Sequence, residues 1–186
     1  MNNYITKHNY SQIAIVSHSR SGTNFLRKNL SDLLDVEINR VGKEGMFYIP
    51  DNPGILQVAV LRNPKDTILS SYSHGERSNQ NFVPERDSVL FQIQKYLGYL
   101  NFYVNNDVRI YDFNNIENAL YDIALEFIDK IPDSFIPGYP EETSEFVPTM
   151  CGTTTYKKIQ DLFSMDDIWL EAESEYFRVL KLAMPI

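Results

Sequence analysis

The chain has 186 residues, of which 43% are hydrophobic and 13% aromatic, and we expect a single domain over residues 1–186 with one sizeable core. Its formal net charge of −8 argues against a dedicated binder of nucleic acid or anionic membranes, because such proteins usually spread basic charge over a face. No apolar run approaches the ~20 residues that span a bilayer, and the N-terminus lacks the basic and apolar regions of a secretory signal. We therefore expect a soluble, cytoplasmic protein without a membrane or nucleic-acid partner.

The first predicted unit is a strand followed by a turn and a helix. Residues 12–17 form a short apolar run, and after Gly22 apolar residues recur at helical spacing through Leu34. Gly22 lets the chain turn without a Cβ penalty and lets a ligand approach the backbone. Free N–H groups at a helix start attract anions, and Arg20 adds a positive charge beside them. This turn therefore predicts a phosphate or sulfate site, with further side-chain donors on Ser21, Thr23 and Asn24.

A second unit of the same kind follows. The apolar run at residues 55–61 predicts a buried strand that ends at Arg62. Directly after it, Asn63 suits a helix N-cap, Pro64 suits the first helical position, and Asp66 lies where a carboxylate can return to the cap. A second helix therefore begins beside the end of the second strand.

The rest of the chain continues the alternation of helices and strands. We expect a long helix over 87–105, a strand over 108–113, a helix over 115–129, and C-terminal helices over about 156–182. Four prolines interrupt residues 131–152, which predicts an irregular loop that acts as a lid or a surface wrap. Alternating strands and helices favour an α/β fold with a short parallel sheet flanked by helices.

Both distinctive turns are expected at the same edge of that sheet, because ligands of open parallel sheets bind beyond the carboxyl ends of the strands. The first turn offers Arg20, and the second offers Arg62 and, on the following helix, Ser70. Ser70 lies close to two helical turns past Asn63, so both face the same side of that helix. One anion at each turn suggests a nucleotide that carries phosphates at two ends.

The turn lacks the features of a Walker-type nucleoside triphosphatase. That motif needs a second glycine and a Lys-Ser/Thr pair that contacts the phosphates and Mg²⁺. Here only Gly22 is present, Arg20 precedes it, and the second strand ends in Arg62 rather than in an aspartate that holds the metal. We therefore expect a metal-free anion site, and a nucleotide or small-molecule kinase with a degenerate loop is the rival among enzymes.

These two motifs resemble those of the sulfotransferases that use 3′-phosphoadenosine-5′-phosphosulfate. The segment RSGTNFL at residues 20–26 is similar to their 5′-phosphosulfate loop. The segment RNPKD at residues 62–66, with Ser70 eight residues after Arg62, is similar to their 3′-phosphate motif. The resemblance covers roughly residues 12–130 and lies closer to the carbohydrate-modifying branch than to the cytosolic branch, whose C-terminal cofactor segment has no clear match here.

The resemblance implies a P-loop NTPase-like sulfotransferase fold and transfer of a sulfuryl group to the hydroxyl or amine of a small-molecule or carbohydrate acceptor, leaving adenosine 3′,5′-bisphosphate. Arg20 would stabilise the leaving oxygen, Thr23 and the helix start would hold the 5′-phosphate, and Arg62 with Ser70 would hold the 3′-phosphate. The cofactor-binding residues implied are Arg20, Ser21, Gly22, Thr23, Asn24, Arg62 and Ser70, without a metal.

The general base is the least defined part of the predicted site. In the carbohydrate branch of the family, a glutamate between the two motifs acts as the general base. The resemblance therefore makes Glu44 the candidate for the base and Glu37 the reserve choice. His18 lies in the first turn, and we expect it to fill the loop rather than to react. A non-catalytic nucleotide-binding or interaction protein on the same fold stays open as an alternative.

Overall fold

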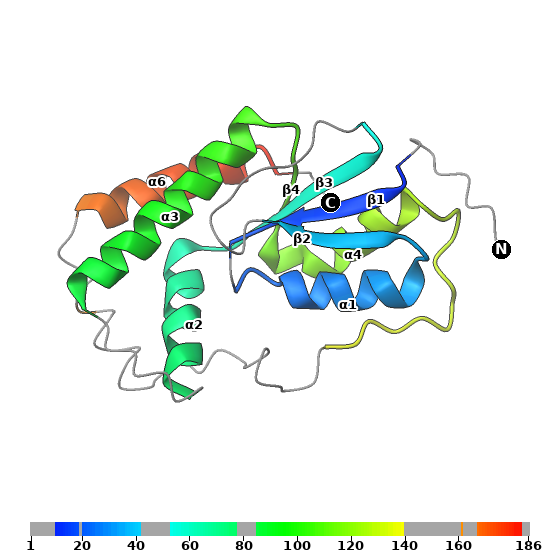
Figure 1. Cartoon of the computed structure of the whole chain (residues 1–186), viewed down its shortest axis with the longest axis horizontal. Helices are drawn as coiled ribbons and strands as arrows, with labels where there is room; N and C mark the ends of the chain where they lie inside the picture. Colours follow the sequence, from blue (N-terminus) through cyan, green and yellow to red (C-terminus); the bar gives the residue numbers. More distant parts are fainter. Residues whose placement is uncertain are drawn as a thin grey trace.

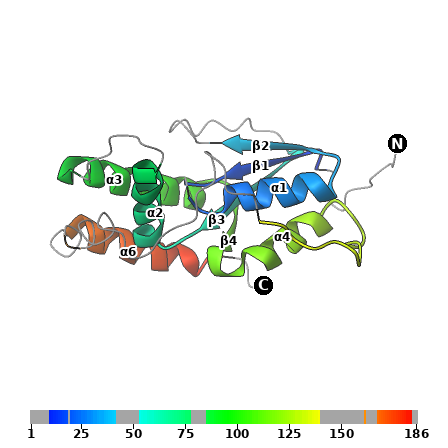
Figure 2. The same cartoon turned by 90° about the horizontal axis from the view of Figure 1, so that it is seen from below.

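The part of the chain that the structure describes has a sheet of four parallel strands at its centre. The structure is a computed structural model that describes residues 10–18, 20–41, 53–77, 85–139, 161 and 167–183, with side chains through residue 72 in the third range. The strands are β1 (Gln12–Val16), β2 (Glu37–Val41), β3 (Ile55–Leu61) and β4 (Arg109–Asp112). They lie in the order β2-β1-β3-β4, as Figure 2 shows. In the parallel register Ile15 of β1 pairs with Arg40 of β2 and with Val58 of β3.

Helices cover both faces of this sheet (Figure 1). On one face lie α1 (Thr23–Leu33) and α4 (Ile116–Leu125), and on the other lie α3 (Arg86–Asn105) and α6 (Asp167–Leu180). A further helix, α2 (Pro64–Arg77), follows the carboxyl end of β3, and the short 3₁₀ helix η1 (Phe113–Asn115) follows β4. With both faces covered, β1 is buried from Ile13 to Val16, as expected for a strand inside a parallel sheet.

The two faces of the sheet build two separate cores because side chains alternate along each strand. Val58 and Val60 of β3 pack with α1 and α4 on one face. Ala59 and Leu61 pack with α3 and α6 on the other. Because all four strands are parallel, their carboxyl ends lie at the same edge of the sheet, where the loops into the helices begin.

The α/β fold with a short parallel sheet flanked by helices is confirmed. Strand β3 has the bounds predicted for residues 55–61. The predicted N-cap of α2 is present, because the N–H of Lys65 donates to Oδ1 of Asn63 at 2.9 Å. One predicted element length was wrong, and one strand was missed. The helix predicted over 115–129 ends at Leu125, where a turn replaces it, and β2 was not predicted at all.

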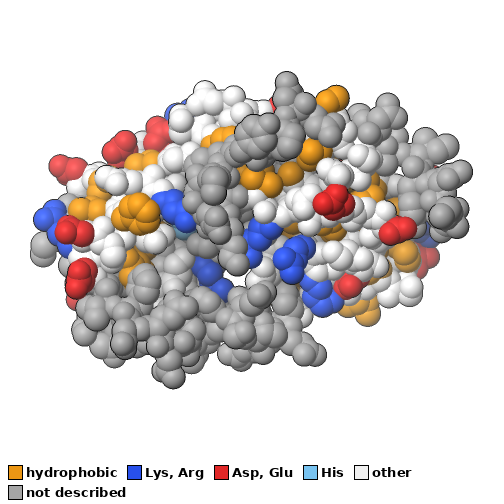
Figure 3. Space-filling model, in the orientation of Figure 1, with side chains coloured by type: hydrophobic (Ala, Val, Ile, Leu, Met, Phe, Trp, Pro, Cys, Tyr) orange, Lys and Arg blue, Asp and Glu red, His pale blue; other side chains and the backbone are white. Residues whose placement is uncertain are grey.

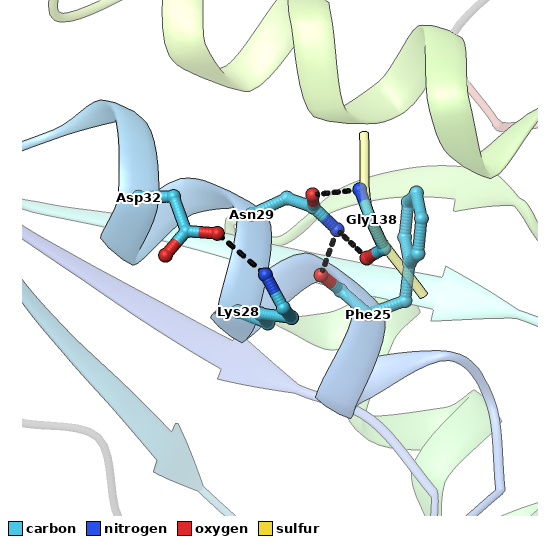
Figure 4. Close-up of polar contacts among 5 residues, drawn as sticks. All are labelled: Phe25, Lys28, Asn29, Asp32 and Gly138. Atoms are coloured by element: carbon cyan, nitrogen blue, oxygen red, sulfur yellow. Dashed lines mark hydrogen bonds and ion pairs between the residues drawn. The ribbon is translucent and has the colours of Figure 1, made fainter. Parts of the chain in front are cut away.

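An irregular segment, residues 131–139, runs along α1 without helix or strand, as predicted for the start of the proline-containing loop; residues 140–152 lie outside the described residues. Figure 4 shows how Asn29 of α1 holds it. The buried Asn29 amide donates to the carbonyls of Phe25 at 2.8 Å and Gly138 at 2.9 Å, and its Oδ1 accepts from the Gly138 N–H at 2.8 Å. One side chain thereby pairs both backbone groups of Gly138. Among the described residues, no helix has the length and apolar character needed to cross a membrane.

Candidate anion-binding site

The strand order marks one place at the sheet edge for a ligand. The chain passes from β1 through α1 to β2 on one side, and from β3 through α2 and α3 to β4 on the other. The direction of the connections therefore changes between β1 and β3, and open α/β sheets bind ligands at such a switch point. Arg20 follows β1 and Arg62 follows β3, so both predicted motifs lie there.

The turn after β1 has an unusual backbone. Arg20 has a φ of 70° and Gly22 a φ of 81°, both in the left-handed region. Gly22 is the N-cap of α1, and a Cβ on it would lie 3.1 Å from Cε2 of Phe113 and would overlap Cδ1 of Ile116. Conformation and packing both require glycine here. The backbone of Arg20, which has a Cβ, is strained in this conformation by ~1–2 kcal/mol, and the surrounding contacts must offset this cost.

The start of α1 carries hydrogen-bond donors suited to an anion. Gly22 has no side chain with which to cap the first-turn N–H groups, and these groups have no partner inside the helix. The first residue of α1, Thr23, is only 3% exposed, and its Oγ1 has no hydrogen-bond partner among the described residues. A buried hydroxyl left unpaired costs ~1–3 kcal/mol. A bound anion would satisfy this hydroxyl and the N–H groups together.

Hydrogen bonds join the two turns into one site. Nε of Arg20 donates to Oγ of Ser70 at 3.1 Å, and Nη1 of Arg62 donates to the carbonyl of Arg20 at 2.8 Å. The guanidinium of Arg62 also lies over the ring of Phe113, 4.5 Å from its centroid, in cation–π contact. The residues predicted to hold the two phosphate ends thus converge, and the side chain of Arg20 reaches the second turn.

A tyrosine of α3 fixes the backbone of this arrangement. The hydroxyl of Tyr96 donates to the carbonyl of Arg62 at 2.7 Å, and burial raises the pKa of this phenol, which keeps it protonated as a donor. His18 is buried beside it, with ring centroids 5.7 Å from Tyr96 and 5.3 Å from Tyr99. His18 therefore packs beneath the turn. Tyr96 was not among the predicted site residues, because only the structure shows which group its hydroxyl contacts.

A third arginine lies near the same edge. Nη1 of the half-buried Arg40, at the end of β2, donates to Oδ1 of Asn24 at 3.3 Å. Figure 3 shows Lys and Arg side chains gathering near the middle of one face, around the place where the strands end in Figure 1. Sequence reasoning missed Arg40 because it missed β2. The signal was present as a short β-branched pattern ending in Arg40 and Val41.

The structure describes only one of the two candidates for the general base. Glu44 lies outside the described residues. Glu37 begins β2, and its carboxylate accepts from Gln12 at 2.6 Å and from Asn39 at 3.0 Å. Glu37 pairs with Gln12 at the amino end of the sheet, whereas Arg20 follows the carboxyl end of β1, so the structure does not bring Glu37 to the predicted site. Among the described residues, no group of three or more His, Cys, Asp and Glu side chains is placed to hold a metal ion.

Comparison of the chain with protein-family models, with curated proteins and with solved structures found no match.

Proposed function

We propose that this chain is a sulfotransferase of the P-loop-like type that uses 3′-phosphoadenosine-5′-phosphosulfate and acts on an acceptor hydroxyl or amine, with a carbohydrate as the favoured acceptor. One observation carries the proposal. Arg20, Arg62 and Ser70, which come from two separate sequence motifs, are joined by hydrogen bonds at the switch point of a parallel sheet. This is the arrangement that a nucleotide with a phosphate at each end requires.

The donors present fit such a cofactor. The unpaired Thr23 hydroxyl and the N–H groups of α1 suit the 5′-phosphate. Arg62 and Ser70 suit the 3′-phosphate, since a guanidinium binds an oxyanion with two parallel hydrogen bonds. A positive Arg62 at the end of β3 also favours a nucleotide bound without Mg²⁺, because a Walker-type site places an acidic ligand of the metal there.

The cofactor would supply an activated sulfuryl group, and the protein would supply position and charge. In the proposed transfer, the acceptor oxygen or nitrogen would form a bond to sulfur while the bond from sulfur to the 5′-phosphate oxygen would break, and the acceptor proton would pass to a base. Arg20 is proposed to stabilise the negative charge on the leaving phosphate oxygen. Glu44 is the proposed base.

The test is transfer of labelled sulfate from the cofactor to a panel of carbohydrate and phenolic acceptors, followed with wild type, Arg20→Ala and Glu44→Gln. We expect transfer by the wild type and a loss of at least ~100-fold in both variants. Glu44→Gln should bind adenosine 3′,5′-bisphosphate as the wild type does, since a base for the acceptor does not contact this product. Unchanged turnover in Glu44→Gln would remove Glu44 from the mechanism.

Two other outcomes separate the rival functions. If the bisphosphate binds and no acceptor in the panel is labelled, the chain is a nucleotide-binding protein without catalysis. If Mg-ATP binds more tightly than the bisphosphate, the chain is a kinase with a degenerate loop, and the sulfotransferase assignment fails.

A further inference from the structure

The outward side of α6 carries two large apolar side chains. This helix packs beside α3, as Figures 1 and 2 show, and buries Trp169, Ala172 and Tyr176. On its other side Leu170 is 63% exposed and Phe177 is 55% exposed. The two lie seven residues apart, close to two helical turns, so they share one flank of the helix. An exposed apolar pair of this kind suits a contact with another protein.

A charged pair with the same spacing lies beside the apolar pair. Glu171 and Arg178 are both exposed and are also seven residues apart. The exposed Ser174 lies midway along the helix, and helical geometry places it opposite the buried Ala172 and Tyr176. The same geometry places the apolar pair on one flank of Ser174 and the charged pair on the other. The outward side of α6 is therefore symmetric in position about one small residue.

We infer that this side of α6 binds a second copy of the chain, with the two α6 helices antiparallel about a two-fold axis at Ser174. Leu170 of one copy then meets Phe177 of the other on one flank of the axis. Glu171 of one copy meets Arg178 of the other on the opposite flank. Each contact occurs twice, because a two-fold interface uses the same patch on both copies. The small Ser174 lets the two helices approach closely at the centre.

The charges along α6 favour a second copy in this orientation over other occupants. Carboxylates gather in the amino half of the helix, and cations lie at its carboxyl end; these residues are Asp167, Glu171, Glu173 and Glu175, and Arg178 and Lys181. Antiparallel pairing sets each acidic half against a basic end, whereas parallel pairing sets like charges together. Arg178 donates to Glu175 of its own helix at 2.7 Å, and its guanidinium has further N–H donors for a carboxylate of the partner.

The inference is independent of the proposed function, because it uses no residue of the candidate anion-binding site. Each copy has a net charge of −8, so two copies repel each other at long range and association has to come from local contacts. We therefore expect a dimer that dissociates on dilution, with a Kd of about 1–100 μM.

Sedimentation velocity of the full chain from about 1 to about 300 μM tests for this dimer. The sedimentation coefficient of the wild type should rise with concentration to that of a dimer. Leu170→Ser should weaken the dimer at least about tenfold, because an apolar contact is lost twice. Ile136→Ser is the matched control. Its side chain is 84% exposed on the segment that runs along α1, over the other face of the sheet, and the substitution should leave the dimer unchanged.

Exchange of charges tests the antiparallel register. Glu171→Arg and Arg178→Glu should each weaken self-association at least about tenfold, because like charges then meet twice. An equimolar mixture of these two variants should associate as the wild type does, since opposite charges face each other again at both contacts. Lys130→Glu changes the net charge as much as Arg178→Glu does, on an exposed side chain that follows α4, and it should keep the dimer.

Three results would overturn the inference. A wild-type chain that stays monomeric over the whole range would exclude a second copy as the occupant of this surface. A dimer that tolerates Leu170→Ser, or that Ile136→Ser weakens equally, would place the interface elsewhere. A mixture of Glu171→Arg and Arg178→Glu that fails to associate, while the wild type forms a dimer, would exclude the antiparallel register. Circular dichroism checks that each variant keeps the helical content of the wild type, as expected for exposed side chains.

Discussion

The guanidinium of Arg20 donates to the hydroxyl of Ser70 at 3.1 Å, although the two residues are 50 positions apart in the sequence. The contact joins the turn after β1 to α2, which begins after β3. Arg62 also holds this turn, because its guanidinium donates to the Arg20 carbonyl at 2.8 Å. A site built this way has its charges in place before a ligand arrives, which lowers the ordering cost of binding.

Thr23→Val should separate binding from stability. Valine has the shape of threonine without the hydroxyl, and this buried hydroxyl has no partner among the described residues. Removing it should leave the free energy of unfolding unchanged or raise it by up to ~1 kcal/mol. The affinity for adenosine 3′,5′-bisphosphate should fall about tenfold, because a donor to the phosphate is lost. Urea denaturation and calorimetry measure the two effects, and a marked loss of stability would mean that the hydroxyl is structural.

Tyr96→Phe should affect recognition of the 3′-phosphate. It removes the 2.7 Å hydrogen bond to the carbonyl of Arg62 and so loosens Arg62. We expect a loss of ~1–2 kcal/mol in stability and a smaller ratio between the affinities for adenosine 3′,5′-bisphosphate and for 5′-AMP.

Tyr111→Phe is the control for this prediction. The Tyr111 hydroxyl donates to Asp122 at 2.6 Å, in contact with α4 rather than with either turn. The Tyr111→Phe variant should lose stability to a similar extent. It should keep the wild-type ratio between the affinities for adenosine 3′,5′-bisphosphate and for 5′-AMP. An equal drop of the ratio in both variants would show that Tyr96 has only a structural role.

Gly22→Ala should destabilise the protein by at least ~2 kcal/mol, because alanine is strained at a φ of 81° and its Cβ would meet Phe113 and Ile116. Gly98→Ala is the matched control inside α3. Among the described residues, no atom outside the backbone of α3 itself lies within 4 Å of a Cβ added there. Alanine is also the better helix former by ~1 kcal/mol, so this variant should be more stable. Urea denaturation measures the change in the free energy of unfolding for both variants. Changes of opposite sign would support the packing described for the turn, whereas an undiminished stability of Gly22→Ala would contradict it.

Asn29→Ala should release the segment that contains Gly138. It removes three hydrogen bonds of a fully buried side chain and leaves both backbone groups of Gly138 without this partner, at a cost of ~2–3 kcal/mol. Hydrogen exchange at the Gly138 N–H should accelerate. Lys28→Ala on the same helix removes an exposed ion pair with Asp32 and should cost no more than ~0.5 kcal/mol. Unaltered exchange in Asn29→Ala would show that other contacts hold the segment.

The sequence allowed the parallel α/β fold to be predicted because its central strands leave strong local signals. β3 is an uninterrupted apolar run that stops at Arg62, and the Asn63-Pro64 pair marks the start of α2. The edge strand β2 has exposed and partly exposed residues throughout, so it lacks the apolar run of a buried strand. Missing β2 also hid Arg40.

The candidate site was predictable in its residues and not in its contacts. Arg20 was assigned to the first turn and Arg62 with Ser70 to the second, and only the structure shows that Arg20 reaches Ser70. Helical spacing cannot reveal that a core tyrosine such as Tyr96 donates to Arg62. The pairing of Asn29 with Gly138 spans 109 positions and leaves no local pattern.

The most direct test of the central claim is a calorimetric titration of the wild-type chain with adenosine 3′,5′-bisphosphate in a metal chelator, beside a titration with Mg-ATP. We expect tight, metal-independent binding of the bisphosphate, weakened at least about tenfold by Arg62→Ala and by Ser70→Ala, since each removes a contact to a charged phosphate. Binding of Mg-ATP should be weaker. Preference for Mg-ATP, or bisphosphate binding that is indifferent to both substitutions, would contradict the account.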